Sequence, residues 1–383
     1  MPRNRVLFIL VLVGLAAALG LAFLTAAPNR LVSGRPIAMV ETLQAARWLI
    51  AVPGLGLAVA AFPAPRPAVC TVAALAAAAL LVALPWLAGA QAAFLAEQAS
   101  PAARTSLGGA FWTIEICAAL ALRDALDRLG LRAPGKLSAL VVVLGALSWL
   151  ALSGRLDALA ITREFLTRED AFGAAARRHV LLVGAALLPT LLLGFPLGIF
   201  AHRRPRLAPG IFATLNLIQT IPAIALFGLL IAPLSGLAAL FPALARLGVA
   251  GIGVTPALIA LTFYSLLPLA RNTAEGLASV PAAITEAASG LGMRPRQIFW
   301  RVEFPLALPV FLAGLRIATV QAVGLAAVAA LIGAGGFGAI MFQGLFADAL
   351  DLVLLGALPV IALGIVADAF FRLAAARFAK SPA

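Results

Sequence analysis

The sequence has few charged residues, since Asp, Glu, Lys and Arg together make up only 11% of its 383 positions. With 63% hydrophobic residues and a mean hydropathy of +1.08, it has too little polar side-chain surface to cover a soluble globule. It contains instead many apolar runs near the length of about 20 residues that a helix needs to cross a bilayer. Because lipid cannot satisfy an open backbone, these runs should be helical. The sequence therefore predicts an all-α polytopic membrane protein.

Side chains that bind metals or perform covalent chemistry are scarce as well. Cys70 and Cys117, the only cysteines, lie inside apolar runs, and their spacing suits neither a disulfide framework nor a metal site. The only histidines, His179 and His202, fall at opposite ends of one predicted span, so they cannot share a metal or a triad. We therefore expect no enzyme and no cofactor bound by this chain.

The apolar runs predict about ten membrane spans. Their approximate ranges are 6–27, 47–63, 68–89, 108–122, 137–153, 179–200, 209–233, 252–270, 304–332 and 350–371. The fourth contains Glu115, for which we expect a structural partner near the outer interface. Its helix should continue onto a polar surface, with the i,i+4 pairs Arg123/Asp127 and Asp124/Arg128.

The first run has two interpretations. MPRNR is a basic segment and LTAA a passable cleavage site, so residues 6–27 could belong to a signal peptide. The apolar stretch is longer than is usual in signal peptides, which favours a retained span.

The basic residues predict the orientation. Lys and Arg concentrate in the short segments that face the cytoplasm if the N-terminus is inside, so both termini are expected there. Trp300 then lies near the inner interface and the other four tryptophans near the outer one. The net charge of +13 does not indicate nucleic-acid binding, because the Arg residues form short clusters between spans and no continuous basic face.

We expect a boundary near residue 155. Residues 1–154 form a five-span membrane extension with few polar groups. The segment 155–179 is charged, with Ala and Phe at helical spacing, and is predicted to be one amphipathic helix on the outer surface. Residues 155–383 form the second predicted domain, with five spans and a charged loop at 281–305. No internal repeat relates the two halves.

Two glycine-rich segments match nucleotide-binding patterns without their context. GAGGFG (333–338) ends a predicted span and does not join a strand to a helix, so we expect a glycine turn there. GLRAPGK (130–136) is followed by Leu137, where a P-loop needs Ser or Thr to bind Mg²⁺. The chain is therefore expected to bind neither ATP nor magnesium.

The stretch EAASGLGMRPRQIFWRVEFP, residues 286–305, is unusually charged for this sequence. Pro281 suits the first turn of a short helix, with Ser279 as its cap. Gly292 can end that helix and Pro295 can begin a second one. The pattern predicts a helix–turn–helix along the cytoplasmic face.

This predicted element also carries a patch of small residues. Ala287 and Ala288 would let a partner approach the first helix closely, which indicates a docking element. Taken singly, Arg294, Arg296 and Arg301 fit an ordinary positive-inside loop better.

The same segment resembles the EAA loop of bacterial ABC-importer permeases, in which Ile-x-Leu-Pro is the usual ending. The resemblance implies a coupling helix that enters a cleft of a separate ATPase, with Glu286 bonding near the cleft and Gly292 permitting the tight turn. The motif residues are Glu286, Ala287, Ala288, Gly292, Val302, Phe304 and Pro305. The implied coupling residues are Glu286, Ala287, Ala288, Gly292, Arg294 and Pro305.

Further segments are similar to the osmoprotectant branch of that family, the glycine betaine and choline permeases. They are NLIQTIPAIALFGLL (216–230), FYSLLPLARNTAEGL (263–277) and LRIATVQAVGLAAVAALIGAGGFG (315–338). The resemblance implies a type I importer fold in the bacterial inner membrane. It also implies an ATPase that holds ATP and magnesium, a substrate-binding protein, and a second permease copy or sibling. Residues 1–153 look like the extended N-terminus of some glycine betaine permeases.

Polar residues within the core spans are candidates for the translocation path. They are Asn216, Gln219, Thr220, Tyr264 and Gln321, and Pro222 and Pro268 mark possible helix breaks or kinks. Each polar side chain fits an interhelical hydrogen bond as well as contact with a solute. Arg316 is either a charged gate residue or extends inward toward the Glu303 end of its helix. With one tyrosine the chain has no evident aromatic cage for quaternary ammonium, so a binding protein should select the substrate.

Two other functions remain open. An ion-coupled secondary transporter would predict inverted repeats and an acid at the membrane midplane, and Glu115 is its one supporting feature. A membrane-bound sensor or scaffold would fit residues 1–153 alone. Association with a P-loop ATPase would separate both from an ABC permease.

Overall fold

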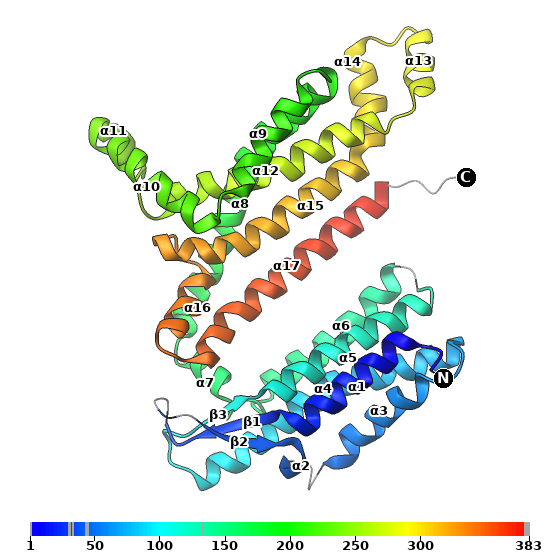
Figure 1. The fold of residues 1–383 in the computed structure, drawn as a ribbon, viewed down its shortest axis with the longest axis vertical. Coiled ribbons are helices and arrows are strands. Elements are labelled where there is room, and N and C mark those ends of the chain that lie inside the picture. The colour runs from blue at the N-terminus through cyan, green and yellow to red at the C-terminus, as the bar shows by residue number, and fades with distance from the viewer. Residues whose placement is uncertain (1, 30–31, 33, 43–45, 132, 379–383) are drawn as a thin grey trace. The chain divides into compact units, whose positions relative to one another are not determined.

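The structure is a computed structural model that describes residues 2–29, 32, 34–42, 46–131 and 133–378. The chain divides into two compact units, Met1–Thr167 and Arg168–Ala383, and the predicted boundary at 154/155 falls inside the first, near its end. Nearly all regular structure in both units is helical (Figure 1). The predicted all-α class is confirmed, although a small sheet in the first unit was not predicted.

The first unit is a helical bundle whose central pair is α4 and α5. Its helices are α1 (Arg5–Gly20), α2 (Met39–Thr42), α3 (Arg47–Ala60), α4 (Pro67–Gln98), α5 (Gly109–Arg128), α6 (Ala133–Leu152) and α7 (Ala160–Leu166). α5 packs against α1 and α4, α4 packs against α3, and α1 and α3 touch far less. Leu84 and Ala77 of α4 and Ala110 of α5 are fully buried in this core.

A three-stranded antiparallel sheet covers one end of this bundle. Its strands are β1 (Ala22–Ala27), β2 (Arg35–Ala38) and β3 (Arg104–Leu107), in the order β2-β1-β3. Leu24 of β1 pairs with Ile37 of β2 and with Leu107 of β3. The predicted first span, 6–27, is therefore wrong at its end: the helix stops at Gly20, and strands distant in sequence satisfy the next backbone groups.

The second unit is built around α12, which packs between α8 and α15. Its elements are α8 (Glu169–Arg203), α9 (Ala208–Thr220), α10 (Ala223–Leu240), α11 (Pro242–Arg246), α12 (Val254–Ala278), α13 (Ala282–Gly290), α14 (Pro295–Ile298), η1 (Phe299–Glu303), α15 (Phe304–Val328), η2 (Ala329–Ile332), α16 (Phe337–Phe346) and α17 (Leu350–Phe378). A Cβ on Gly314 of α15 would lie 2.5 Å from Asn272 Cβ and 2.9 Å from the Pro268 carbonyl oxygen of α12. The two helices therefore touch backbone to backbone.

Among the described residues, seven helices are long and apolar enough to cross a membrane, and α1, α3 and α16 are shorter apolar helices. The predicted span 209–233 is wrong as one helix, because α9 ends at Thr220 and α10 begins at Ala223. The predicted extension of the fourth span is confirmed by α5, which reaches Arg128. It carries both expected pairs, Arg123–Asp127 at 3.9 Å and Arg128–Asp124 at 2.8 Å.

The single amphipathic helix predicted for 155–179 is also wrong. The segment contains turns, the short helix α7, and the first turns of the long helix α8. Arg168, with φ −136°, interrupts the helical path, and α8 then starts with Glu169 and Asp170. Acidic side chains favour a helix N-terminus, so these charges begin a long apolar helix.

Candidate functional site

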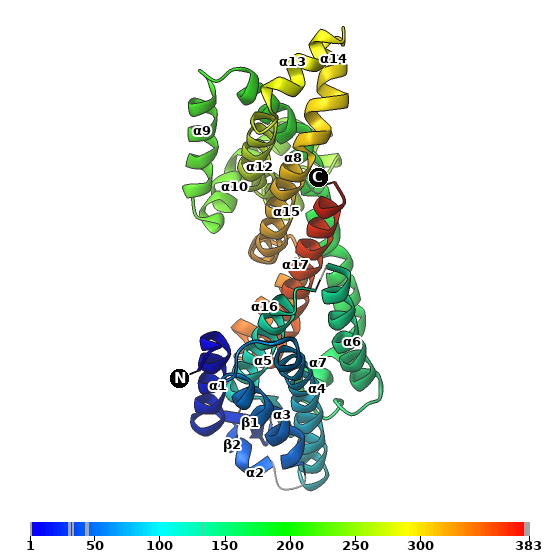
Figure 2. The same ribbon diagram turned by 90° about the vertical axis from the view of Figure 1, so that its right-hand side faces the viewer.

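The charged loop lies at one end of the second unit, where α13, α14 and η1 connect α12 to α15 (Figures 1 and 2). The predicted helix–turn–helix is confirmed. α13 ends at Gly290, Gly292 adopts φ +78°, and α14 begins at Pro295. The amide of Met293 donates to the Ala288 carbonyl at 3.2 Å, which closes the turn.

One detail of the predicted helix start is wrong. Ser279 Oγ donates to the Gly276 carbonyl at 2.7 Å, so this side chain caps the end of α12 and not the start of α13. Pro281 immediately precedes α13, with φ −60° and ψ 131°. Its fixed φ suits the entry into the helix without a side-chain cap.

α13 presents an exposed surface of mixed character. Glu286 and Ala287 are exposed, whereas Ala288 is only 6% exposed and faces the protein. Two large apolar side chains are also open, Ile284 at 41% exposure and Leu291 at 83%. Uncovered large apolar side chains on and just after one short helix are a feature of a protein-binding surface.

The second half of the loop is anchored on three helices by aromatic packing. Phe299 is buried with Leu277 of α12 and Ala307 of α15, and Phe195 of α8 packs against this cluster. The ring centroids of Phe195 and Phe304 lie 5.4 Å apart in an edge-to-face arrangement. We call Phe195, Phe299, Trp300, Phe304 and Phe311 the aromatic anchor. Sequence reasoning missed this cluster, although most of its rings lie within and just after the charged loop.

Charged side chains tighten the same junction. Arg203 Nη2 at the end of α8 lies 3.7 Å from Glu303 Oε2, and its Cζ lies 5.5 Å from the centroid of the Phe299 ring. Arg316, predicted either to act at a gate or to extend inward toward the Glu303 end of its helix, pairs with an acid of another helix. Arg316 Nη1 lies 3.5 Å from Asp368 Oδ1 on α17, and the Asp368 carboxylate also forms an ion pair with Arg372. These contacts join α15 to α17.

The start of α14 is held by reciprocal hydrogen bonds. The amide of Arg294 donates to Gln297 Oε1 at 2.8 Å, and the amide of Gln297 donates to the Arg294 carbonyl at 2.8 Å. A π-helical turn, Phe299–Glu303, then leads into α15. π-helical turns occur frequently at functional sites.

Three of the candidate path residues meet at the break between α9 and α10. Pro222 directly precedes α10, which confirms the predicted break, whereas Pro268 lies inside an uninterrupted α12. Tyr264 Oη of α12 donates to the Ile221 carbonyl in the break. Gln219 Nε2 of α9 donates to the Tyr264 carbonyl at 2.6 Å. Open backbone at membrane depth needs such partners, and α12 supplies one to the break.

The other candidate path residues are not brought into this group. Asn216 and Thr220 are exposed on α9, and Thr220 Oγ1 donates to its own helix at the Leu217 carbonyl, 2.7 Å away. Gln321 is half-buried on α15. Their contact with a solute stays a prediction.

The remaining singled-out residues have structural settings. GAGGFG forms the turn between η2 and α16, with Gly333, Gly335 and Gly336 at φ of +81°, +83° and +78°. The glycine turn is confirmed, because only glycine adopts such a run readily. In the first unit, we expected a structural partner for Glu115. This expectation is wrong for its Oε1, which is buried without a hydrogen-bond partner among the described residues.

Known proteins are similar to both parts of the chain. Residues 194–380 match the family described as "Binding-protein-dependent transport system inner membrane component". Residues 3–162 match the family "ABC transporter permease YehY, N-terminal domain". The two families thus cover most of each compact unit.

Individual relatives match about half of the chain. The osmoprotectant import permease protein OsmW of Salmonella typhimurium strain LT2 is 40% identical over 50% of this chain and 84% of that protein. The choline transport system permease protein OpuBB of Bacillus subtilis strain 168 is 37% identical over 54% of this chain and 86% of that protein. A solved inward-facing structure of the MetNI methionine ABC transporter is 22% identical, with a TM-score of 0.44, over 53% of this chain and 95% of that chain.

Proposed function

Because the chain belongs to the permeases of binding-protein-dependent ABC importers, we propose that it is the membrane subunit of an importer for osmoprotectants such as glycine betaine or choline. It is a multi-pass protein of the inner membrane. The substrate class is supported by the names of the relatives, which are permeases for osmoprotectants and for choline. The observation that carries the proposal is the exposed α13 helix joined to α8, α12 and α15 by the aromatic anchor.

The exposed part of the loop is the proposed docking site for an ATPase. Glu286 and Ala287 lie on the open face of α13, Gly292 and Arg294 follow it in the turn, and Pro305 is exposed in the first turn of α15. Ala288 faces inward, so its small size serves the packing of α13 within the loop. ATP and magnesium are held by this partner in the proposed complex, and the chain itself binds no cofactor.

Force on α13 can reach the membrane region through packed contacts. Phe299 and Phe304 transmit a displacement to α8, and the loop is continuous with α12 and α15. The backbone contact at Gly314 makes α12 and α15 move as one body, since packed helices do not deform continuously. The partner can shift the equilibrium only by its differential affinity for the two arrangements of the loop.

The proposed translocation path follows the break between α9 and α10. Movement of α12 reaches this break through the hydrogen bonds of Tyr264 and Gln219, which join the break to α12. We assign these two residues the role of positioning the break along the path. The proposed path residues are Asn216, Gln219, Thr220, Pro222, Tyr264 and Gln321.

The complete importer needs further subunits. A separate substrate-binding protein delivers the osmoprotectant, and a second permease, a copy or a sibling, forms the other half of the path. Both termini lie in the cytoplasm in this arrangement, so α13 and α14 face the ATPase.

Uptake by proteoliposomes tests the proposal. The permease is reconstituted with its ATPase and its binding protein, and entry of labelled glycine betaine is measured with internal ATP or with an ion gradient alone. We expect ATP-dependent uptake that falls at least tenfold in Glu286→Arg and persists in the control Thr285→Val, whose Oγ1 bonds only the Ala282 carbonyl of the same helix at 2.8 Å. Uptake driven by a sodium or proton gradient without ATP would instead assign the chain to the secondary transporters.

A further inference from the structure

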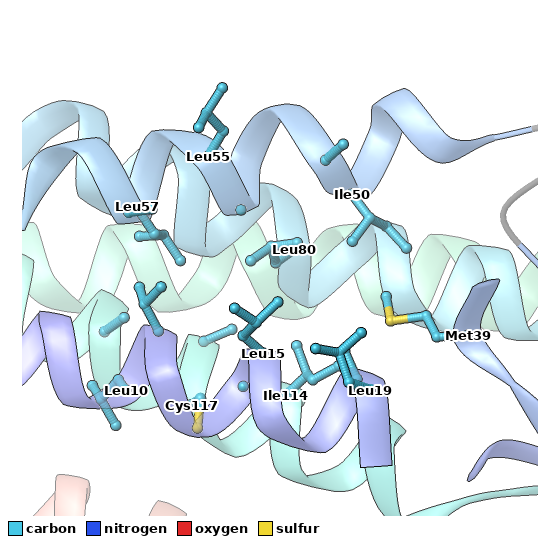
Figure 3. A pocket seen from close by; sticks show the side chains of 18 of the residues that line it. Leu10, Leu15, Leu19, Met39, Ile50, Leu55, Leu57, Leu80, Ile114 and Cys117 are labelled. Carbon is cyan, nitrogen blue, oxygen red and sulfur yellow. The ribbon is translucent and has the colours of Figure 1, made fainter. Parts of the chain in front are cut away.

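The first unit contains an apolar cavity of about 470 Å³ between α1 and α3, closed on its inner side by α4 and α5. Figure 3 shows Leu10 and Leu57 toward one end of the cavity and Leu19 and Met39 toward the other. It lies where α1 and α3 fail to pack closely. An empty space of this size would cost the lining side chains their dispersion contacts.

The mouth of the cavity is lined by apolar side chains that no described residue covers. Leu15 is 55% exposed, Leu55 is 65% exposed and Leu19 is 74% exposed. All three lie on helices of almost wholly apolar composition in a membrane protein. Hydrocarbon is therefore the medium that meets the cavity.

Two glycines make the cavity wide in the middle of its helices. A Cβ built on Gly14 of α1 or on Gly54 of α3 would meet no atom within 4 Å. Both residues line the cavity. Glycine inside a helix costs about 1 kcal/mol relative to alanine, and here no close helix contact accounts for that cost. The missing side chains at both positions leave room for an occupant.

One end of the cavity carries a positive charge. Arg47, the first residue of α3, lines the cavity one turn before Ile50, which lies toward the Met39 end in Figure 3. Its guanidinium lies 5.3 Å from the ring centroid of Trp48, and it forms no ion pair with a carboxylate among the described residues. An Arg next to an exposed Trp is typical of the boundary between hydrocarbon and head groups.

We propose that this cavity binds an acyl chain of an anionic phospholipid, with Arg47 holding the phosphate. Arg suits this role because its planar guanidinium donates paired hydrogen bonds to phosphate oxygens. An acyl chain that enters the cavity leaves one apolar surrounding for another, so chain burial adds little selectivity. The head group must supply the preference, and the site is independent of the proposed transport function.

Native mass spectrometry of the full chain in mild detergent tests the site. The purified protein is stripped of lipid and offered phosphatidylglycerol, phosphatidylethanolamine or oleate at equal concentrations. We expect one tightly retained phosphatidylglycerol per chain in the unaltered protein. The double variant Gly14→Leu/Gly54→Leu fills the cavity and should lose it. Arg47→Gln should reduce the preference for the anionic lipid about fivefold, the usual effect of one basic residue near a lipid surface.

Gly145→Leu in α6 is the matched control, because a Cβ there also meets nothing within 4 Å and the residue does not line the cavity. It should retain lipid like the unaltered protein. Equal retention of phosphatidylethanolamine, stronger binding of oleate, or unchanged retention in the double variant would each overturn the assignment. If the double variant fails to fold, Arg47→Gln on the folded protein decides, and an unchanged lipid preference refutes the site.

Discussion

Replacing Tyr264 by Phe removes one oxygen atom from the break between α9 and α10 and leaves the ring in place. Tyr264 Oη is the donor to the Ile221 carbonyl, which lies between two helices. Ile221 is half-buried, and a fully buried carbonyl left without a partner costs about 1–3 kcal/mol, so the lower part of that range applies here. A change at the lower end of that range shifts a two-state equilibrium about 5-fold. We therefore expect the break to be held less firmly on α12 in Tyr264→Phe, where the hydrogen bond from Gln219 to the backbone carbonyl of residue 264 remains.

Two assays check this expectation. In detergent the apparent melting temperature should fall by several degrees, since each kcal/mol corresponds to roughly 2–4 °C for a domain of 150–250 residues. In proteoliposomes, ATP-dependent uptake should fall while binding to the ATPase is kept. Thr214→Val is the control, because its hydroxyl donates to the Gly210 carbonyl of its own helix α9 at 3.0 Å and the residue is not in the proposed path. Wild-type melting and uptake in Tyr264→Phe would refute the reasoning.

Two glycines give further predictions. Gly292 has φ +78°, so Gly292→Ala should strain the turn by about 1–2 kcal/mol and weaken pull-down of the ATPase, whereas Gly290→Ala, in open space without positive φ, should leave it unchanged. Equal pull-down by both would contradict the turn's role. Gly314→Leu should force α15 off α12 and cost about 1–3 kcal/mol in thermal unfolding, whereas Gly324→Leu on the same helix has room for its Cβ. Matching melting curves for these two would contradict the close contact.

The charged loop was predictable in part, because its limits depend on local backbone preferences. Pro295 at the start of α14 and Gly292 in the left-handed turn are both placed as expected. The anchoring of the loop was not predictable, because Phe195 meets Phe304 from a different helix. The cap assigned to Ser279 failed for a related reason: its hydroxyl had two helix ends within reach, and it bonds the preceding one.

The charged residue Arg316 shows the same limit within a span. Sequence reasoning identified it as unusual and expected either a gate residue or an extension inward toward the end of its own helix that carries Glu303. In the structure Glu303 forms an ion pair with Arg203, and Arg316 forms one with Asp368 of α17. Which acid an intramembrane Arg reaches depends on which helices pack together, and no local pattern contains that information.

By itself the sequence determined that this protein is a bundle of apolar helices in a membrane. Composition and run length decide which segments lie in lipid, and a backbone without water must form a helix there. It also determined the short charged helix pair, through Pro and Gly positions that act within a few residues. Only the tertiary structure decided that residues 22–27 pair as a strand and that the backbone opens at Ile221. Both depend on hydrogen-bond partners supplied by segments distant in sequence.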